Sequence, residues 1–587
     1  MKRAIKKGLA LIILLSLVLC GCGDGVAGSG SEAGDKAATA EESTEAATGE
    51  GSEAGDKAAP AEESTEAATG EGSETEDKAA ASEAAEAEAG DLIIPFVSHQ
   101  YIDRYEGANR LYYSKYDLLS LGNYSNDYPE LEKALSSRND EIKKEKEADA
   151  DERGSEAKEW QKEMNEESSF YTVSRTFVKR ADKGIFSFVV KYEDFLGGAH
   201  GMNGIAGYNY YPETGEEIPL SDIIKDTDLL NDILSDKLKL KYPDIEWFED
   251  LKETFSKYGK EGSDYTYNWV LENQGITFFF NPYEIAAYAY GRQTVTIPYD
   301  EVPGLFTEKI KGNDGQYVSA FDLYDEVSVF DGDGSEKILN IDADFDYDSY
   351  GSPGDYPVKA LTLYYDGHEL KDEDSPVAYA YQHDMYLVHT GDGRNYVYID
   401  CYQDNDWHSV IAYELSADGV KKLKETNGSF YVSSVPDDEV FWRPAVFNQE
   451  KFELQHRADM LSTVSSTCYY RTGKDGNPEP YTNYVTIISE TVIKSVRPLR
   501  ARYMGETQDL SVDAPEVGGE DEHVTELPAK TGFRLWRTDN ESYVDCVVEE
   551  DGKHNVYRLI QETDKDYNRM IDGVNIEDCF EELFWAG

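Results

Sequence analysis

The sequence predicts an α+β domain followed by a mostly β region, with a disordered acidic tether in front of them. Three observations predict this fold class. Helical and strand patterns alternate between residues 91 and 310, whereas strand patterns dominate residues 311–587. The repeated unit within residues 23–90 contains no aromatic or large aliphatic residue, so it can bury almost nothing and is expected to stay disordered.

The first 22 residues predict export and a lipid anchor. Four Lys and Arg residues precede an apolar run, residues 9–19, which is too short to span a membrane and suits the core of an export signal. The run ends in Leu19-Cys20-Gly21-Cys22, which resembles the lipobox of bacterial lipoproteins. That resemblance implies that Cys22 becomes a lipidated N-terminus at the extracytoplasmic face of the cell membrane. An ordinary cleaved signal is the alternative, and we expect no further membrane span.

A repeat makes up most of the tether. A 21-residue unit begins at Gly30, recurs at Gly51 with one substitution, and fades by Gly90. It consists mainly of Ala, Glu, Ser, Thr and Gly, and residues 24–90 carry a net charge of −16. Repulsion between like charges should extend this segment. We expect a spacer that crosses a cell wall, with a partner-binding acidic tail as the alternative.

The chain is strongly acidic. It has 117 Asp and Glu residues against 56 Lys and Arg residues, a formal net charge of −61. This balance excludes a nucleic-acid binder that works through a basic face. Residues 91–587 alone carry −49, so most of the acidity belongs to the region expected to fold. We expect that region to attract cationic partners, and the attraction should weaken with salt.

The region 91–310 alternates between helix and strand. A helix is predicted from Tyr128 to about Ser169, with Pro129 in its first turn and an interruption at Gly154. Strands, a second helix and a closing pair of strands are predicted at residues 170–180, 184–192, 207–211, 220–240, 276–280 and 293–298.

A glycine-rich loop separates two of these strands. Four glycines between Phe195 and Gly204 predict positive φ angles or a close backbone approach. His200 lies within this loop, but a hydrolase would also need a nucleophile and an orienting acid, and no Gly-x-Ser-x-Gly sequence is present. We therefore expect His200 to hold the loop by hydrogen bonding. Nearby Tyr residues could stack on sugar rings or on cations, or simply pack. The candidate ligand-binding residues are Gly197, Gly198, His200, Tyr283 and Tyr288.

Two segments resemble one known family. They are Gly197-Gly198-Ala199-His200 with the later Leu220-Ser221-Asp222, and the run 275–291 with the strand that follows it. Together they resemble the extracytoplasmic domain shared by RsiV-type anti-sigma factors and PdaC-type peptidoglycan deacetylases, over residues 95–310. The resemblance implies an α+β fold and a binding role, since RsiV-type domains bind lysozyme. The chain has neither a sigma-binding segment nor the Thr-Phe-Asp-Asp-Gly and His-x-x-x-His sequences of a deacetylase, so neither of those activities is implied.

Residues 311–587 read as strands separated by turns. Alternating runs such as 356–365 and 396–402 are separated by Asp-Gly turns, which favours a sandwich, a barrel or a partial propeller. The last part suggests a small barrel, similar to an SH3 domain. The predicted division is a signal at 1–22, a tether at 23–90, an α+β domain at 91–310, a β-rich domain at 311–500 and a small β domain at 501–587.

Metal and disulfide sites are weakly indicated. Asp342, Asp344 and Asp346 alternate and are candidates for calcium, although the run does not fit an EF-hand loop and also suits one solvated face of a strand. We expect no cofactor. Of the four cysteines that remain after processing, Cys546 and Cys579 are nearest in sequence and are the candidate disulfide; buried free thiols are the alternative.

Together these features predict a cell-surface lipoprotein that binds without catalysis. The expected ligand is an extracellular cationic protein such as lysozyme, or a cell-wall glycan, and not nucleic acid. A cell-wall-modifying hydrolase or deacetylase-associated protein and a purely structural envelope module are the alternatives.

Overall fold

The computed structural model describes most of the chain after residue 91: residues 92–165, 168–260, 263, 265–313, 315–330, 335–347, 356–372, 382–402, 408–431, 442–519, 522–550, 552–565 and 568–585. The predicted signal, the lipidation residue Cys22 and the tether lie outside these residues. Of the helices in the described part, none is long and apolar enough to cross a membrane.

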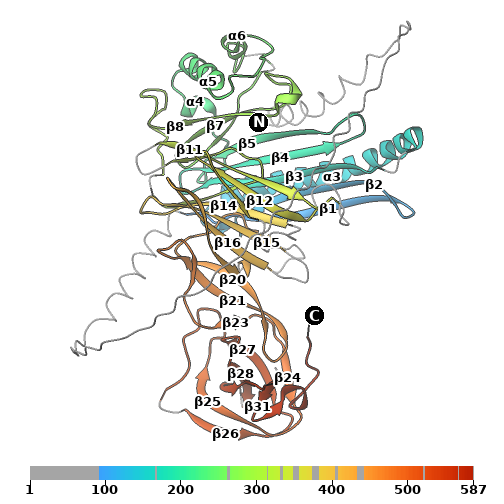
Figure 1. The fold of residues 1–587 in the computed structure, drawn as a ribbon, viewed down its shortest axis with the longest axis vertical. Helices are drawn as coiled ribbons and strands as arrows, with labels where there is room; N and C mark the ends of the chain where they lie inside the picture. Colours follow the sequence, from blue (N-terminus) through green and yellow to red (C-terminus); the bar gives the residue numbers. More distant parts are fainter. Residues whose placement is uncertain are drawn as a thin grey trace, which may run out of the picture. The chain divides into compact units, whose positions relative to one another are not determined.

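The described residues are mostly β, with 50% in strands and 16% in helices. Their four α-helices all fall between residues 129 and 255, so helix and strand mix in the first region and strands dominate the second, as the patterns predict (Figure 1). The helices are α3 (Pro129–Met164), α4 (Leu220–Ile223), α5 (Thr227–Lys241) and α6 (Leu251–Phe255).

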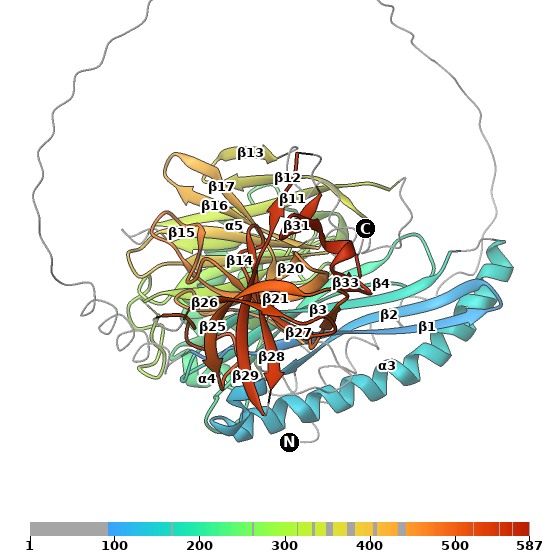
Figure 2. The ribbon, with the colours of Figure 1, turned by 90° about the horizontal axis from the view of Figure 1, so that it is seen from below.

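A six-stranded sheet is the frame of the first region, in the order β19-β1-β2-β3-β4-β5. Its neighbours pair antiparallel except β2 and β3, which are parallel because the chain crosses over between them through α3. Helix α3 lies along β1 and β2 (Figure 2). The strands are β1 (Phe96–Glu106), β2 (Asn109–Ser120), β3 (Phe170–Ala181), β4 (Phe186–Phe195), β5 (Met202–Tyr210) and β19 (Arg443–Pro444).

Helix α3 runs without a break for 36 residues. Pro129 stands in its first turn and Asn165 ends it in the left-handed conformation. The interruption predicted at Gly154 is wrong. The glycine there accommodates a close neighbour, because a Cβ at residue 154 would lie 3.2 Å from the Cβ of Arg104. The Arg104 guanidinium then donates to acids on the same helix, Glu147 at 2.6 Å and Asp151 at 2.7 Å.

A three-stranded sheet, β6-β7-β8, joins the edge of β5 through asparagine side chains rather than a backbone ladder. Asn209 on β5 donates to Trp269 O at 3.0 Å and accepts from Leu271 N at 2.7 Å. In the opposite direction, the side-chain oxygen of Asn268 on β6 accepts from Gly207 N on β5 at 2.9 Å. Each amide thus reproduces one donor–acceptor pair of a strand. The strands are β6 (Asn268–Leu271), β7 (Gly275–Phe280) and β8 (Gln293–Pro298).

The small helices cover this second sheet. Apolar residues of α5 and α6, including Leu234, Leu238 and Phe255, form one core with Phe278 and Phe280 of β7. The apolar spacing of α5 places these leucines on one face, and Asp226 caps the helix by accepting from Leu229 N at 3.0 Å. This packing brings the segment after β7 next to the end of β4.

Two sheets that share one core begin the second region. Their orders are β10-β11-β12-β13 and β17-β16-β15-β14-β9. The strands are β9 (Tyr317–Phe321), β10 (Val327–Phe330), β11 (Glu336–Phe345), β12 (Val358–Tyr365), β13 (His368–Asp372), β14 (Gln382–His389), β15 (Asn395–Tyr402), β16 (His408–Ser416) and β17 (Gly419–Asn427).

The last part forms a 12-stranded sheet and a small three-stranded one, β30-β31-β32. Their strands are β18 (Ser429–Tyr431), β20 (Phe452–Asp459), β21 (Thr463–Thr472), β22 (Pro478–Pro480), β23 (Val485–Ile487), β24 (Val492–Ser495), β25 (Leu499–Thr507), β26 (His523–Leu527), β27 (Gly532–Thr538), β28 (Tyr543–Glu550), β29 (Lys553–Ile560), β30 (Glu562–Thr563), β31 (Arg569–Ile571), β32 (Val574–Asn575) and β33 (Phe580–Glu581).

Contacts in the structure cross the predicted domain boundary at residue 310. Strand β19, from the second region, pairs with β1, and residues from both sides of 310, such as Phe188 and Tyr398, belong to one core. The boundary at residue 500 falls inside β25. The path of the 12-stranded sheet has two free ends, β18 and β26, so its described strands do not close into an SH3-like barrel. Alternation identifies strands but not their distant partners, so contacts of this kind cannot be predicted from it.

Candidate functional site

The glycine-rich loop links β4 to β5 and has the backbone that the sequence predicts. Gly197 and Gly198 have φ angles of +86° and +108°. A Cβ on Gly197 would lie 2.9 Å from both the Trp160 indole nitrogen and the Phe170 ring. The loop is therefore pressed onto the end of α3, and only glycine fits at residue 197.

Three of the residues chosen from the sequence come together at this loop. The His200 ring stacks on Tyr288 with centroids 4.3 Å apart and an angle of 23° between planes. The Tyr283 ring lies 5.4 Å from that of Tyr288. His200 and Tyr283 are exposed and Tyr288 is half-buried. We call His200, Tyr283 and Tyr288 the aromatic platform.

Hydrogen bonds to one carbonyl hold the platform in place. His200 Nδ1 lies 2.8 Å from Gly201 O, and the Tyr288 hydroxyl donates to the same oxygen at 2.9 Å. The expectation that His200 fixes its loop by hydrogen bonding agrees with this geometry. Among the described residues, Gly201 is its only hydrogen-bond partner, so no nucleophile–His–acid arrangement forms there.

The segment that carries Tyr283 and Tyr288 is anchored to β5. The side chain of Asn281 accepts from Ile205 N at 2.9 Å and donates to Ile205 O at 3.1 Å. Glu284 accepts from Asn281 N at 2.9 Å and from the Tyr258 hydroxyl at 2.8 Å. Tyr283 itself has a φ of +70°, a conformation that a non-glycine residue adopts only when its surroundings impose it.

Glu284 is a residue of this site that the sequence reasoning missed. Burial raises the pKa of Glu284 to about 6, although hydrogen bonds from Asn281 and Tyr258 favour the charged form. No local signal distinguishes this glutamate, because its surroundings include Tyr258, which follows α6 and is distant in sequence.

We predict a pH-dependent effect of Glu284→Gln. Because the folded pKa lies above the unfolded one, Glu284 favours the folded state below pH 4.5, and this contribution is lost as the pH rises through about 6. Glutamine does not titrate, so the variant should gain about 1–2 kcal/mol relative to the parent between pH 4.5 and 7.5. Urea unfolding across this range measures the difference. The exposed Glu213→Gln is the control, and a flat difference for Glu284→Gln would contradict the prediction.

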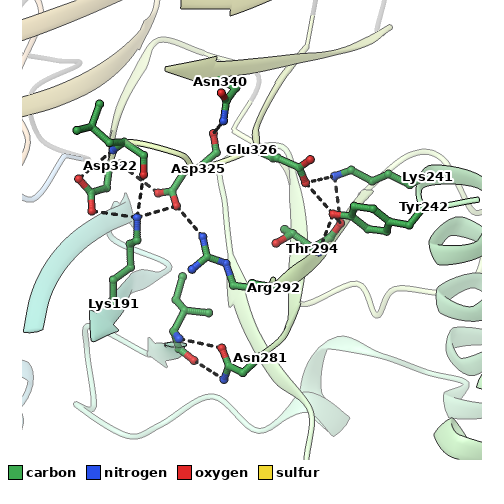
Figure 3. A network of polar contacts seen from close by, with 12 residues as sticks. Lys191, Lys241, Tyr242, Asn281, Arg292, Thr294, Asp322, Asp325, Glu326 and Asn340 are labelled. Atoms are coloured by element: carbon green, nitrogen blue, oxygen red, sulfur yellow. Dashed lines mark hydrogen bonds and ion pairs between the residues drawn. The ribbon is translucent and has the colours of Figure 1, made fainter. Parts of the chain in front are cut away.

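A largely buried ionic network joins β4 and Arg292, the residue before β8, to the second region (Figure 3). Lys191 of β4 contacts Asp322 at 2.9 Å and Asp325 at 3.0 Å, and Arg292 reaches Asp325 at 3.0 Å. Burial alone would raise the pKa of Asp322, but Lys191 and Arg175 outweigh it and hold that pKa at about 2. The sequence reasoning did not anticipate this network.

The network continues toward the small helices. Lys241 at the end of α5 contacts Glu326 at 2.9 Å, and the Tyr242 hydroxyl donates to Glu326 at 2.7 Å (Figure 3). Tyr242 also accepts from Thr294 N of β8 at 3.0 Å. A cavity of about 30 Å³ borders Arg292, Thr294 and Asp325. It has room for one or two water molecules but not for an organic ligand.

The calcium candidates do not converge. Asp342 and Asp344 lie on β11 and Asp346 follows it, which matches the solvated-strand interpretation. Asp346 pairs with Lys359 at 2.9 Å and Asp344 lies 3.8 Å from Lys371. In the described part of the chain, no three His, Cys, Asp or Glu side chains are placed to hold a metal ion.

The candidate disulfide is absent from the structure. Cys401, Cys468, Cys546 and Cys579 are all free and buried, which is the alternative that the sequence left open. Burial raises the pKa of both Cys546 and Cys579, so their reactive thiolate forms are suppressed.

We therefore predict that these four thiols resist alkylation in the native protein and react after unfolding without a reductant. Peptide mapping by mass spectrometry, after iodoacetamide treatment with and without urea, measures this. Modification of the unfolded chain alone is the expected result. A peptide pair linked through Cys546 and Cys579 would instead establish the disulfide.

Comparisons with known proteins place one part of the chain in a family. The family model described as "Protein of unknown function (DUF3298)" matches residues 221–300, from α4 to β8. The chain thus contains a DUF3298 domain, which includes Tyr283 and Tyr288 but not the glycine-rich loop.

Two solved structures of the same family are similar to this chain. A DUF3298 family member from Bacteroides fragilis NCTC 9343 is 20% identical, covers 37% of this chain and 95% of its own, and has a TM-score of 0.29. A DUF3298 family protein from Pseudomonas aeruginosa PAO1 is 18% identical, covers 36% and 94%, and has a TM-score of 0.25. No curated protein matches this chain.

Proposed function

We propose that this protein is a lipoprotein on the extracytoplasmic face of the membrane that binds a cationic extracellular protein or a cell-wall glycan without catalysis. The observation that carries the proposal is the aromatic platform: three neighbouring rings at the surface, with His200 stacked on Tyr288 and hydrogen-bonded to its own loop. Such a surface offers stacking contacts but no reacting group. The most specific version of the proposal is that the ligand is a lysozyme-like protein.

Two further features support the proposal. The residues that carry the resemblance to RsiV-type domains, the loop 197–200 and the segment 275–291, lie against each other in space. The charge of −49 on residues 91–587 favours encounter with a cationic partner over an acidic one. The sequence also carries the lipobox-like Leu19-Cys20-Gly21-Cys22 in front of a repeated acidic segment.

Binding of lysozyme to the full chain, purified in detergent, tests the function. Biolayer interferometry at about 50 and 300 mM salt should show binding that weakens with salt. Tyr288→Ala should weaken binding roughly tenfold, because it removes the central ring of the stack. Tyr105→Ala, which removes a tyrosine 56% exposed on β1, is the matched control. If lysozyme does not bind at low salt, the proposal that lysozyme is the ligand is wrong. Binding of glycan fragments instead would support a cell-wall ligand.

The anchor has its own test. Cys22→Ser should abolish incorporation of a labelled fatty acid and release the protein from the membrane fraction, while Cys20→Ser should leave lipidation intact. Retention of the lipid label in Cys22→Ser would contradict the assignment.

A further inference from the structure

Two residues of the platform, His200 and Tyr288, use their hydrogen-bond donors internally. A carbonyl oxygen can only accept, so the contact between His200 Nδ1 and Gly201 O requires the proton on Nδ1. In neutral His200 the other ring nitrogen, Nε2, therefore carries a lone pair. The Tyr288 hydroxyl likewise spends its proton on Gly201 O and retains lone pairs. What the two groups offer a ligand is acceptors and ring faces.

The neighbouring strand adds a carboxylate to this acceptor surface. The Tyr171 hydroxyl on β3 donates to exposed Glu193 at the end of β4, at 2.7 Å. Burial and Glu193 raise the pKa of Tyr171. Glu193 lies opposite Asn203 in the pairing of β4 with β5, at the end of the strands that the glycine-rich loop connects. The Tyr171 hydroxyl thus uses its proton within the protein, and the acceptor that remains is the negatively charged Glu193 carboxylate. An anionic ligand would therefore meet lone pairs and a like charge.

We propose that the platform captures a guanidinium group, the side chain of an arginine presented by a cationic protein; this rests on the proposed binding function. A guanidinium is flat and permanently charged, and it stacks on aromatic faces while its N–H groups donate in its plane. It can donate to His200 Nε2 or the Tyr288 hydroxyl while its face lies on a ring. A lysine ammonium is a more strongly hydrated point charge and stacks less well, and a neutral sugar would use only part of the acceptor set.

The test compares three immobilised peptides that differ only in the cationic group. A peptide with four arginines separated by glycines is matched by lysine and citrulline versions, citrulline being the neutral urea analogue of arginine. Biolayer interferometry with the full chain in detergent, at about 150 mM salt to screen the net charge, gives the affinities. We expect the arginine peptide to bind roughly tenfold more tightly than the lysine peptide. The ratio of its affinity to that of the citrulline peptide should be larger again.

Two variants assign the preference to the platform. His200→Phe keeps a ring to stack on Tyr288 but removes Nε2, and Tyr288→Phe keeps the ring but removes the hydroxyl. Each should reduce the arginine peptide to the affinity of the lysine peptide. His368→Phe is the matched control, because His368 is exposed at the start of β13, outside the platform. Circular dichroism confirms that each variant is folded.

The outcomes separate the inference from the function on which it rests. Equal affinity for arginine and lysine peptides, or an unchanged preference in both variants, overturns the guanidinium site even if lysozyme binds. Competition by glycan fragments, with no arginine preference, overturns it in favour of a cell-wall ligand. A preference for arginine that depends on His200 supports the site even where lysozyme itself fails to bind.

Discussion

Replacing Gly207 with alanine is expected to destabilise the protein by about 3 kcal/mol or more. A Cβ at residue 207 would lie 2.1 Å from Trp269 O and 2.6 Å from the adjoining carbonyl carbon, both backbone atoms of β6 that cannot turn aside. β5 and β6 would have to separate. That movement would break the hydrogen bonds of Asn209 to Trp269 and Leu271, which join the two sheets.

Urea unfolding followed by tryptophan fluorescence measures this loss, since Trp269 reports on β6 directly. Gly391→Ala is the matched control: its Cβ would meet only Gln316, at 3.9 Å, and its φ is not positive. That variant should change stability by less than about 1 kcal/mol. A Gly207→Ala protein as stable as the parent would show that the asparagine junction between β5 and β6 is not rigid.

Lys191→Met is expected to cost about 3 kcal/mol at neutral pH. The Lys191 ammonium contacts Asp322 and Asp325 and donates to Leu323 O at 3.1 Å, with only 18% of its side chain exposed. Methionine fills a similar volume but leaves Asp322 without the cation that it faces. Removing one partner of a buried pair leaves an uncompensated charge, which costs more than the pair contributes.

The cost of this substitution should depend on pH. The pKa of Asp322 in the folded protein, about 2, lies below its ordinary 3.8. Its ion pairs therefore stabilise the parent above about pH 4, and this contribution is lost as the pH falls through 2. The difference between parent and variant should shrink from pH 7 to pH 3 in urea unfolding.

Two further variants control the Lys191 experiment. Lys133→Met, at a lysine of α3 with 77% of its side chain exposed, should change stability by less than about 0.5 kcal/mol. Adding Asp322→Asn to Lys191→Met should recover part of the loss, because it removes the unpaired charge. A loss that does not vary with pH would show that packing rather than charge holds β4 against the segment 321–325.

Much of the local structure could be predicted from the sequence. The helix from residue 129, the strand at 186–195, the glycine-rich loop and the strands at 275–280 and 293–298 all follow from apolar spacing and glycine placement. His200, Tyr283 and Tyr288 were chosen on residue type and motif, and the structure brings them together within one stack. The break expected at Gly154 failed because a neighbouring strand occupies the space left by the missing Cβ.

The remaining features depend on contacts between distant residues. Glu284 is contacted by Tyr258, which follows α6 and is distant in sequence. Lys191 forms an ion pair with Asp322, which lies 131 positions further along the chain. The pairing of β19 with β1 joins two regions that the helix and strand patterns had separated at residue 310. A strand's alternation records which side chains face inward but not which strand lies opposite, so no local pattern encodes these partners.

The sequence by itself determined the acidic charge, the elements and the loop that holds His200, because these depend on composition and on neighbours a few residues apart. Only the tertiary structure decided that the regions on either side of residue 310 share one core, and that His200 and Tyr288 both donate to the carbonyl of Gly201. The physical reason is the same for both. Hydrogen bonds and ion pairs are satisfied by whichever groups the fold brings within about 3 Å, irrespective of their distance along the chain.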